Sequence, residues 1–180
     1  MKAWRLRPPR KNLTQCPGSV DHYILRGLGG NDTIRGGNSE DFLFGDEGAD
    51  RLSGGSSGDQ FYFNAAQESY RTATVSFSDI ITDFTDEGGG HDLLAVFPMG
   101  FYAIGDGHAG RLKIDYNPGL DRTYIRDLDG DGQSHFFQVV LSGNHAETLT
   151  RQNFSFADGT PLPDIGLIGV AEHSAEGALL

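Results

Sequence analysis

Apolar positions in the first third of the chain are sparse and evenly spaced. Between residues 27 and 62, a dependably apolar side chain recurs only once in nine residues, and Gly- and Asp-rich segments separate these positions. The four positions are Ile34, Leu43, Leu52 and Phe61. Because successive side chains of a strand point to opposite faces, the pattern predicts four three-residue strands at 33–35, 42–44, 51–53 and 60–62, each burying its middle side chain.

A second pattern begins at Phe61. Short apolar clusters alternate with polar and Gly-rich turns, which is typical of short strands. Longer candidate strands are RLKIDYN (111–117), RTYIRD (122–127) and FFQVVLSG (136–143), and AETLTRQNFSF (146–156) predicts a turn or short helix before a last strand. The open end of a stack of loops invites aggregation unless it is covered. We therefore expect residues 64–156 to form a β-rich cap continuous with a repeat region over 21–63.

Glycine and aspartate follow the same period of nine. Glycine opens each repeat at Gly27, Gly36, Gly45 and Gly54, and aspartate holds the sixth position at Asp32, Asp41, Asp50 and Asp59. A period kept in register favours a folded repeat over a flexible Gly/Asp linker. Positions one to six predict a tight loop, since glycine reaches backbone conformations that strain other residues. Two repeats then make one turn of a flattened, all-β coil.

Stacking such a coil brings like charges together. Parallel strands lie about 4.7–4.9 Å apart, which places Asp32 beside Asp50 and Asp41 beside Asp59. A calcium ion with oxygen ligands at about 2.3–2.6 Å spans that gap. The predicted ligands are these four carboxylates with backbone carbonyl groups of the loop glycines Gly27, Gly30, Gly36, Gly45, Gly48 and Gly54. If calcium holds the turns together, folding depends on calcium.

The run resembles the calcium-binding RTX nonapeptide repeat, G-G-x-G-x-D-x-U-x, and the resemblance implies a parallel β-roll. Leu28 and Asp46 replace the second glycine, and Ser39 and Ser57 replace the glycine at position four. We expect the sites of these repeats to bind calcium less tightly.

Residues 61–156 resemble the C-terminal portion of the R-modules of secreted mannuronan C5-epimerases, which act on alginate. ESYRTATVSFSDIITDF (68–84), GFYAIGDGHAGRL (100–112) and FFQVVLSGNHAETLTRQNFSF (136–156) carry the likeness. A looser likeness links DIITDF and DLDGDG to the C-terminal domain of serralysin metalloproteases. In an alginate-binding module, basic side chains face a polyuronate, and Arg71, Arg111, Lys113, Arg122 and Arg126 are the candidates, with ordinary solvated strand residues as the alternative.

The segment DLDGDG has two interpretations. Asp127, Asp129 and Asp131 alternate ahead of Gly132, which is the opening of an oxygen-ligand calcium loop. The position of the bidentate Glu of an EF-hand holds Gln138. The alternatives are a calcium site, as in serralysin-like C-terminal domains, and an acidic hairpin turn.

Other acidic and histidine residues carry weaker signals. Asp79, Asp83 and Asp92 flank predicted strands, where turn and cap roles compete with a further calcium site. The six histidines show no paired spacing, so we expect surface or turn positions for them.

The charge balance fits a cation-binding body. The chain has a net charge of −11, but its first twenty residues hold five basic and no acidic residues, which leaves nine basic against 25 acidic residues in the rest. Such a body attracts cations and repels nucleic acid. The single cysteine, Cys16, allows no intrachain disulfide, and no apolar run is long enough for a membrane span.

The two ends differ from the body. Residues 1–20 lack the apolar region of a secretory signal and predict a disordered or truncated leader. Residues 157–180 predict a flexible tail, and resemblance to RTX exoproteins implies a type I secretion signal there, with Glu176 ahead of Ala178-Leu179-Leu180.

The leading hypothesis is a non-catalytic, monomeric calcium-binding module, exported by the type I secretion machinery, that folds on meeting extracellular calcium. It would bind alginate in support of a mannuronan C5-epimerase. The alternative is the calcium-binding C-terminal secretion domain of a serralysin-like protease. A third hypothesis, that the chain is itself an enzyme, lacks a metal-protease motif, a nucleophile constellation or a paired acid/base cluster.

Overall fold

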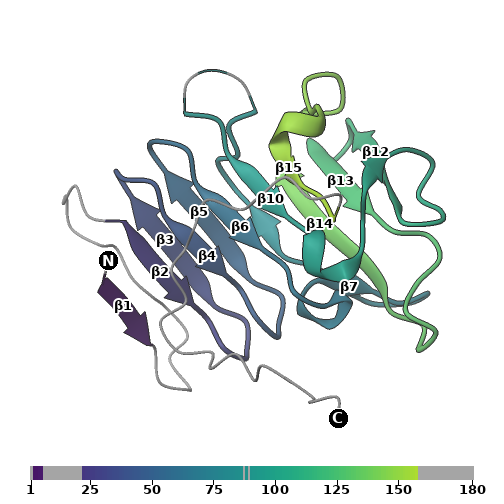
Figure 1. The fold of residues 1–180 in the computed structure, drawn as a ribbon. Coiled ribbons are helices and arrows are strands. Elements are labelled where there is room, and N and C mark those ends of the chain that lie inside the picture. Colours follow the sequence, from purple (N-terminus) through teal and green to yellow (C-terminus); the bar gives the residue numbers. More distant parts are fainter. Residues whose placement is uncertain (1, 6–21, 87, 89, 158–180) are drawn as a thin grey trace, which may run out of the picture.

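Two β-sheets lie face to face in the computed structural model, which describes residues 2–5, 22–86, 88 and 90–157 (Figure 1). All neighbours in the first sheet are parallel. Its order is β1 (Lys2–Arg5), β2 (Tyr23–Arg26), β4 (Phe42–Phe44), β6 (Gln60–Tyr62), β10 (Leu93–Ala95) and β15 (Phe154–Ser155). The four strands expected from the period of nine are therefore confirmed, and they alternate between the two sheets.

The second sheet joins the other repeat strands to the C-terminal part of the chain. Its order is β11 (Ala103–Ile104), β12 (Arg111–Asn117), β13 (Arg122–Arg126), β14 (Phe136–Ser142), β9 (Ile80–Ile81), β5 (Arg51–Gly55) and β3 (Thr33–Gly37). Strand β7 (Tyr70–Arg71) pairs with β14 and with β8 (Ser76–Phe77). From β14 to β3 the strands are parallel, whereas β12, β13 and β14 form an antiparallel meander. The fold is thus an all-β parallel β-roll with a β-rich cap, as the sequence predicts.

Buried apolar side chains form two columns between the sheets. The columns follow the strand register and run through Leu25, Leu43, Phe61, Leu94 and Phe154 in the first sheet, and through Ile34, Leu52, Ile81 and Leu141 in the second. None of these side chains is more than 5% exposed. Full burial of such a side chain contributes about 1.5–3 kcal/mol, so each column residue of the repeat strands adds only a modest increment to the core. Strand β14 contributes more, because Phe137, Val139, Val140 and Leu141 are all buried.

The roll continues into the cap without a break. Strand β9 pairs with β5, and β10 pairs with β6, although both follow the last repeat. Short 3-10 helices, η1 (Ala66–Glu68), η2 (Phe97–Met99) and η3 (Arg151–Asn153), lie between the later strands. None of the helices in the described residues has the length and apolar character that crossing a membrane requires.

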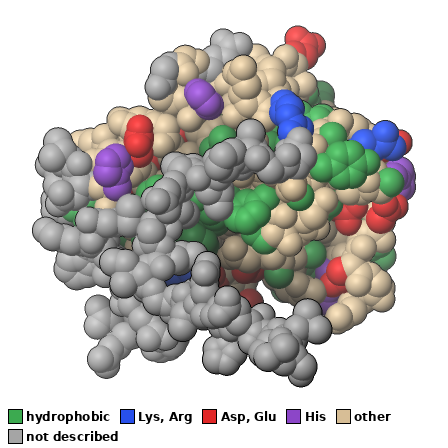
Figure 2. All heavy atoms as spheres, viewed as in Figure 1, with side chains coloured by type: hydrophobic (Ala, Val, Ile, Leu, Met, Phe, Trp, Pro, Cys, Tyr) green, Lys and Arg blue, Asp and Glu red, His purple; other side chains and the backbone are tan. Residues whose placement is uncertain are grey.

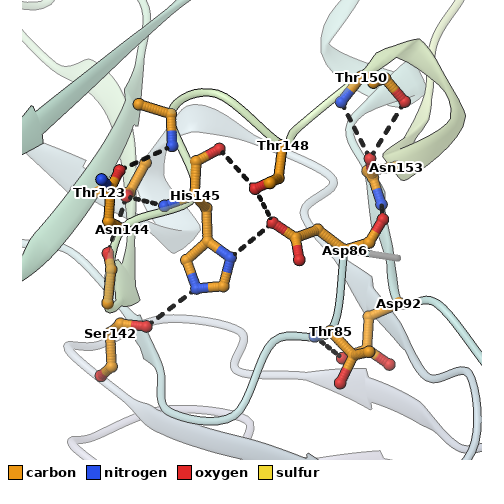
Figure 3. A network of polar contacts seen from close by, with 12 residues as sticks. Thr85, Asp86, Asp92, Thr123, Ser142, Asn144, His145, Thr148, Thr150 and Asn153 are labelled. Carbon is orange, nitrogen blue, oxygen red and sulfur yellow. Dashed lines mark hydrogen bonds and ion pairs between the residues drawn. The ribbon is translucent and has the colours of Figure 1, made fainter. Parts of the chain in front are cut away.

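A polar network ties the segment after β9 to the C-terminal turn (Figure 3). Asp86 Oδ2 accepts hydrogen bonds from His145 Nδ1 (2.9 Å) and from the Thr148 hydroxyl, and Asn153 Nδ2 donates to the Asp86 carbonyl (3.0 Å). Burial raises the pKa of Asp86, but the hydrogen bonds from Thr148 and His145 outweigh it and lower that pKa. His145 lies in a turn, as expected for the histidines, but its side chain is only 13% exposed.

The N-terminal leader lies only partly within the described residues. Residues 2–5 form β1, parallel to β2, with Lys2 opposite Tyr23. The remainder of the leader predicted over 1–20, and the tail from residue 158 with its expected secretion signal, lie outside the described residues.

Candidate metal centre

The position-six aspartates form one ladder on each edge of the roll. On each rung, Oδ1 of one aspartate accepts the backbone N–H of the residue eighteen positions earlier. Asp50 accepts from Asp32 (2.6 Å), Asp59 from Asp41 (2.8 Å), and Asp41 from Tyr23 (2.8 Å). The structure therefore brings together the two aspartate pairs that the period of nine predicts.

The second oxygen of these carboxylates faces inward without a partner. Oδ2 of Asp41, Asp50 and Asp59 is buried and accepts no hydrogen bond, and the three residues are at most 2% exposed. Burial, followed by repulsion from neighbouring carboxylates, raises the pKa of Asp50 to about 7 and that of Asp59 to about 8. A buried anion is costly unless it is paired, so these sites fit a bound cation.

Position-one glycines leave room beside these oxygens. A Cβ on Gly27 would lie 2.5 Å from the Gly45 carbonyl oxygen, and one on Gly36 would lie 2.5 Å from both the Gly54 carbonyl oxygen and Asp41 Oδ2. No side chain fits there, and the space is lined by carbonyl and carboxylate oxygens. These are the hard oxygen ligands that calcium prefers.

Ligands for such an ion would come mostly from the backbone. No group of three or more His, Cys, Asp or Glu side chains gathers in the part of the chain that the structure describes. On each rung of a ladder, the available ligands for an ion are one or two carboxylate oxygens and the carbonyl groups of the glycine-rich loops. Gly30 and Gly48 have φ of 107° and 156° and shape these loops. Calcium tolerates this mixture because its coordination is flexible and uses six to eight oxygens.

Departures from the repeat pattern carry a visible conformational cost. Leu28 and Asp46 stand where the repeat has glycine, with φ of 76° and 61°. Ser57 at position four has φ of 81°. Left-handed backbone costs a non-glycine residue about 1–2 kcal/mol, so these repeats contain local strain.

Replacing Leu28 by glycine should stabilise the calcium-loaded protein by about 1 kcal/mol, because the relieved strain exceeds the extra flexibility that glycine gives to the unfolded chain. Urea denaturation in excess calcium measures the change. The control is Leu120→Gly, since Leu120 is 57% exposed and is not among the described residues with positive φ. That variant should lose stability, and a loss of stability in Leu28→Gly as well would contradict the assignment of strain.

The DLDGDG loop is a turn in which each carboxylate has local partners. Asp127 accepts the backbone N–H groups of Asp129 (3.1 Å) and Gly130 (2.8 Å). Asp129 accepts from His108 Nδ1 (2.6 Å), and Asp131 accepts from Gln67 Nε2 (2.7 Å). These contacts are those of an acidic hairpin turn. All three residues also border a hollow of about 370 Å³, and calcium binding at this loop stays a prediction.

Two aspartates beyond the repeats extend the ladders. Asp79 Oδ1 accepts the backbone N–H of Asp50 (2.8 Å), and Asp92 Oδ1 accepts that of Asp59 (2.8 Å). In the sequence, both residues are compatible with a turn role and with a calcium site. A usable signal was present, because each precedes a buried apolar residue by two positions, Ile81 and Leu94, as in the repeats. Asp83 instead accepts from Ser53 Oγ (2.6 Å) and from the backbone of Gly54 (3.1 Å).

Basic side chains concentrate on one sheet. Seven of the nine basic residues between 22 and 157 lie on strands of the second sheet. They are Arg35, Arg51, Arg71, Arg111, Lys113, Arg122 and Arg126. Five of these are the sequence-predicted residues, and Arg35 and Arg51 were not predicted. In the view of Figure 2, most of the visible Lys and Arg side chains lie on the side of β12 and β13, and hydrophobic side chains occupy the middle of the face.

The chain matches a family of calcium-binding repeats and a solved structure. A family model described as "RTX calcium-binding nonapeptide repeat (4 copies)" matches residues 24–61. The solution structure of the AlgE6R2 subunit of the Azotobacter vinelandii mannuronan C5-epimerase is 35% identical, with a TM-score of 0.59 over 77% of this chain and 90% of that chain. The chain belongs to the R-module family of the mannuronan C5-epimerases. The RTX repeats of this R-module bind calcium.

Curated relatives of this R-module are longer proteins. Mannuronan C5-epimerase AlgE6 of Azotobacter vinelandii is 38% identical over 110 residues, which are 61% of this chain and 12% of the relative. Alginate lyase 7 of the same organism is 36% identical over 100 residues, which are 54% of this chain and 11% of the relative. The R-module therefore spans about a tenth of the length of these two relatives.

Proposed function

We propose that this R-module binds alginate, or a chemically similar polyuronate, and supports a mannuronan C5-epimerase without catalysing a reaction itself. The observation that carries this proposal is the basic outward side of the second sheet. A protein with a net charge of −11 repels a polyanion overall. Binding therefore requires a local surface where basic groups prevail.

Strand alternation points these basic groups outward. Arg122 and Arg126 flank the buried residues Thr123 and Ile125 on β13, while Arg51 precedes buried Leu52 on β5. Five strand steps separate β3 from β12. At about 4.8 Å per step, the basic side chains extend over about 24 Å, which suits an extended chain with a carboxylate on every sugar.

Several of these groups are available to a ligand. Lys113 and Arg126 share Asp115 (3.0 and 3.6 Å), and Arg111 pairs with Asp106 (3.0 Å). Within the described residues, no ion pair engages the remaining four, which are Arg35, Arg51, Arg71 and Arg122. Arginine forks bind carboxylates in a bidentate manner, so the unpaired arginines are the first candidates for contacts with uronate groups.

The relatives favour this polymer over the alternatives. Mannuronan C5-epimerases and an alginate lyase are among the proteins that contain a segment similar to this module. These matches do not favour the C-terminal domain of a serralysin-like protease. Extracellular location and type I export remain parts of the proposal that rest on resemblance.

Calorimetry of the calcium-loaded protein with oligomannuronate tests the proposal. Wild type should bind, and Arg51→Ala/Arg122→Ala should bind at least about tenfold more weakly, because each lost arginine removes a charge-assisted hydrogen bond. Binding should also weaken as the salt concentration rises.

The control is Arg26→Ala/Arg151→Ala, which removes the same charge from β2 of the first sheet and from η3. This control should change the affinity less than about twofold, since it alters only long-range charge. Absence of binding by wild type in excess calcium, or equal losses in the two double variants, would overturn the proposal. A neutral glucan oligomer provides the ligand control and should not bind.

A further inference from the structure

The two carboxylate ladders end differently where the roll meets the cap. On one edge the ladder passes from Asp32 through Asp50 to Asp79, and on the other from Asp41 through Asp59 to Asp92. The last steps span 29 and 33 residues instead of eighteen. Asp79 and Asp92 thus occupy repeat positions in space although both lie outside the matched repeats at 24–61.

Asp79 presents a free oxygen to the last loop of its edge. The residue is fully buried at 0% exposure, and its Oδ2 accepts no hydrogen bond. Oδ2 of Asp50 is also buried and unpartnered. The two oxygens face the same loop of the roll.

Gly45 lies between these two oxygens. A Cβ on Gly45 would lie 2.6 Å from Asp50 Oδ2 and 2.6 Å from Asp79 Oδ2. Because each oxygen lies 2.6 Å from this Cβ position, the two oxygens are at most 5.2 Å apart, which is twice that distance. Oxygens bound to one calcium ion at about 2.3–2.6 Å obey the same limit.

Asp92 lacks this free oxygen. Its Oδ1 accepts from the Asp59 backbone, and its Oδ2 accepts the backbone N–H of Thr85 at 2.8 Å (Figure 3). Both oxygens therefore serve as hydrogen-bond acceptors. Asp92 is buried like Asp79, at 2% exposure. Neutral backbone N–H groups satisfy both of its oxygens at the end of its ladder.

We propose that Asp79 is a calcium ligand, which with Asp50 and the Gly45 loop forms a site at the junction of roll and cap, whereas Asp92 closes the other edge by hydrogen bonds alone. The proposed ion links the repeats to the cap, because the Asp79 backbone is held by cap residues. Its N–H donates to Ser69 Oγ (2.8 Å), and its carbonyl accepts from the Val140 N–H (3.0 Å).

Calcium stoichiometry by equilibrium dialysis separates the two aspartates. Asp79→Asn should bind one calcium ion fewer than wild type, whereas Asp92→Asn, the matched control, should bind the same number. Asparagine keeps the Oδ1 acceptor for the ladder hydrogen bond and removes the charge. An unchanged stoichiometry in Asp79→Asn, or an equal loss in Asp92→Asn, would overturn the proposal.

A second variant keeps every carboxylate. Gly45→Ala places a methyl group at the point between the two oxygens, at a residue that is not among those with positive φ. Gly45→Ala should bind one calcium ion fewer than wild type, as Asp79→Asn does. A purely structural role of Asp79 predicts instead that Gly45→Ala retains the wild-type number of ions, and that result would contradict the site.

The chelated protein gives an independent readout. Without calcium, Asp79→Asn should be at least as stable as wild type, because the substitution removes an unpaired buried charge. A merely structural aspartate predicts lower stability of this variant in chelator. Thermal denaturation in chelator distinguishes the two roles, and a lowered Tm would count against the calcium site.

Discussion

Removing calcium at pH 8 is expected to unfold the roll. Asp41, Asp50 and Asp59 each bury an oxygen that no donor satisfies, and the core offers only one column residue per strand to offset this cost. A bound ion contributes about 2.7 kcal/mol at a concentration of 100 Kd. For a domain of this size, each ion should raise Tm by roughly 5–10 °C.

Far-UV circular dichroism and thermal denaturation, with and without chelator, measure this effect. The strand signal should disappear in chelator at about 37 °C, above the lowered Tm of the calcium-free protein, and return when calcium is restored in excess. Magnesium serves as the control, because it requires near-ideal octahedral geometry and releases its water reluctantly, so it should not restore the fold. A chelated protein with an unchanged spectrum and Tm would show that the roll does not depend on calcium.

Acidification is expected to stabilise the calcium-free protein. In the folded chain, burial raises the pKa of Asp50 to about 7 and that of Asp59 to about 8, from 3.8. A raised folded-state pKa means that the folded chain holds protons more tightly than the unfolded chain. Stability is therefore fully present below about pH 3.8 and is lost progressively as the pH rises from there to 7 or 8, where the loss reaches on the order of 4 kcal/mol per carboxyl group.

Denaturation of chelated protein between pH 9 and pH 5 tests this sign. The apparent Tm should rise as the pH falls, while calcium affinity should fall over the same range because protons compete for the carboxylates. Asp50→Asn/Asp59→Asn is the control and should show a much flatter pH dependence in chelator. A Tm of the chelated wild type that falls steadily with acid would contradict the assignment.

The sequence is more informative about the repeats than about the cap for a physical reason. In the repeats, a step of eighteen residues places Asp32 beside Asp50, so spacing alone predicts the neighbours. In the cap, the connections to Asp79 and Asp92 have lengths of 29 and 33 residues. No period identifies these partners, because irregular loops of different length return the chain to the same ladder.

The basic surface illustrates the same limit. Arg122 and Arg126 are recognisable as candidates on a predicted strand, but Arg51 belongs to a repeat whose sequence suggests only calcium binding. It joins the others because β5 pairs with β9, and β9 with β14. Which residues share a face thus depends on long-range strand pairing.

The sequence by itself determined the period of nine, the all-β roll, the pairs of aspartates and calcium binding by the repeats. These follow from local spacing, since each repeat meets its neighbour at a constant separation along the chain. Tertiary structure alone decided how the two ladders end, with a free oxygen on Asp79 and a satisfied one on Asp92. That difference depends on whether one backbone N–H, that of Thr85, reaches a carboxylate, and only packing of the cap against the roll sets this contact.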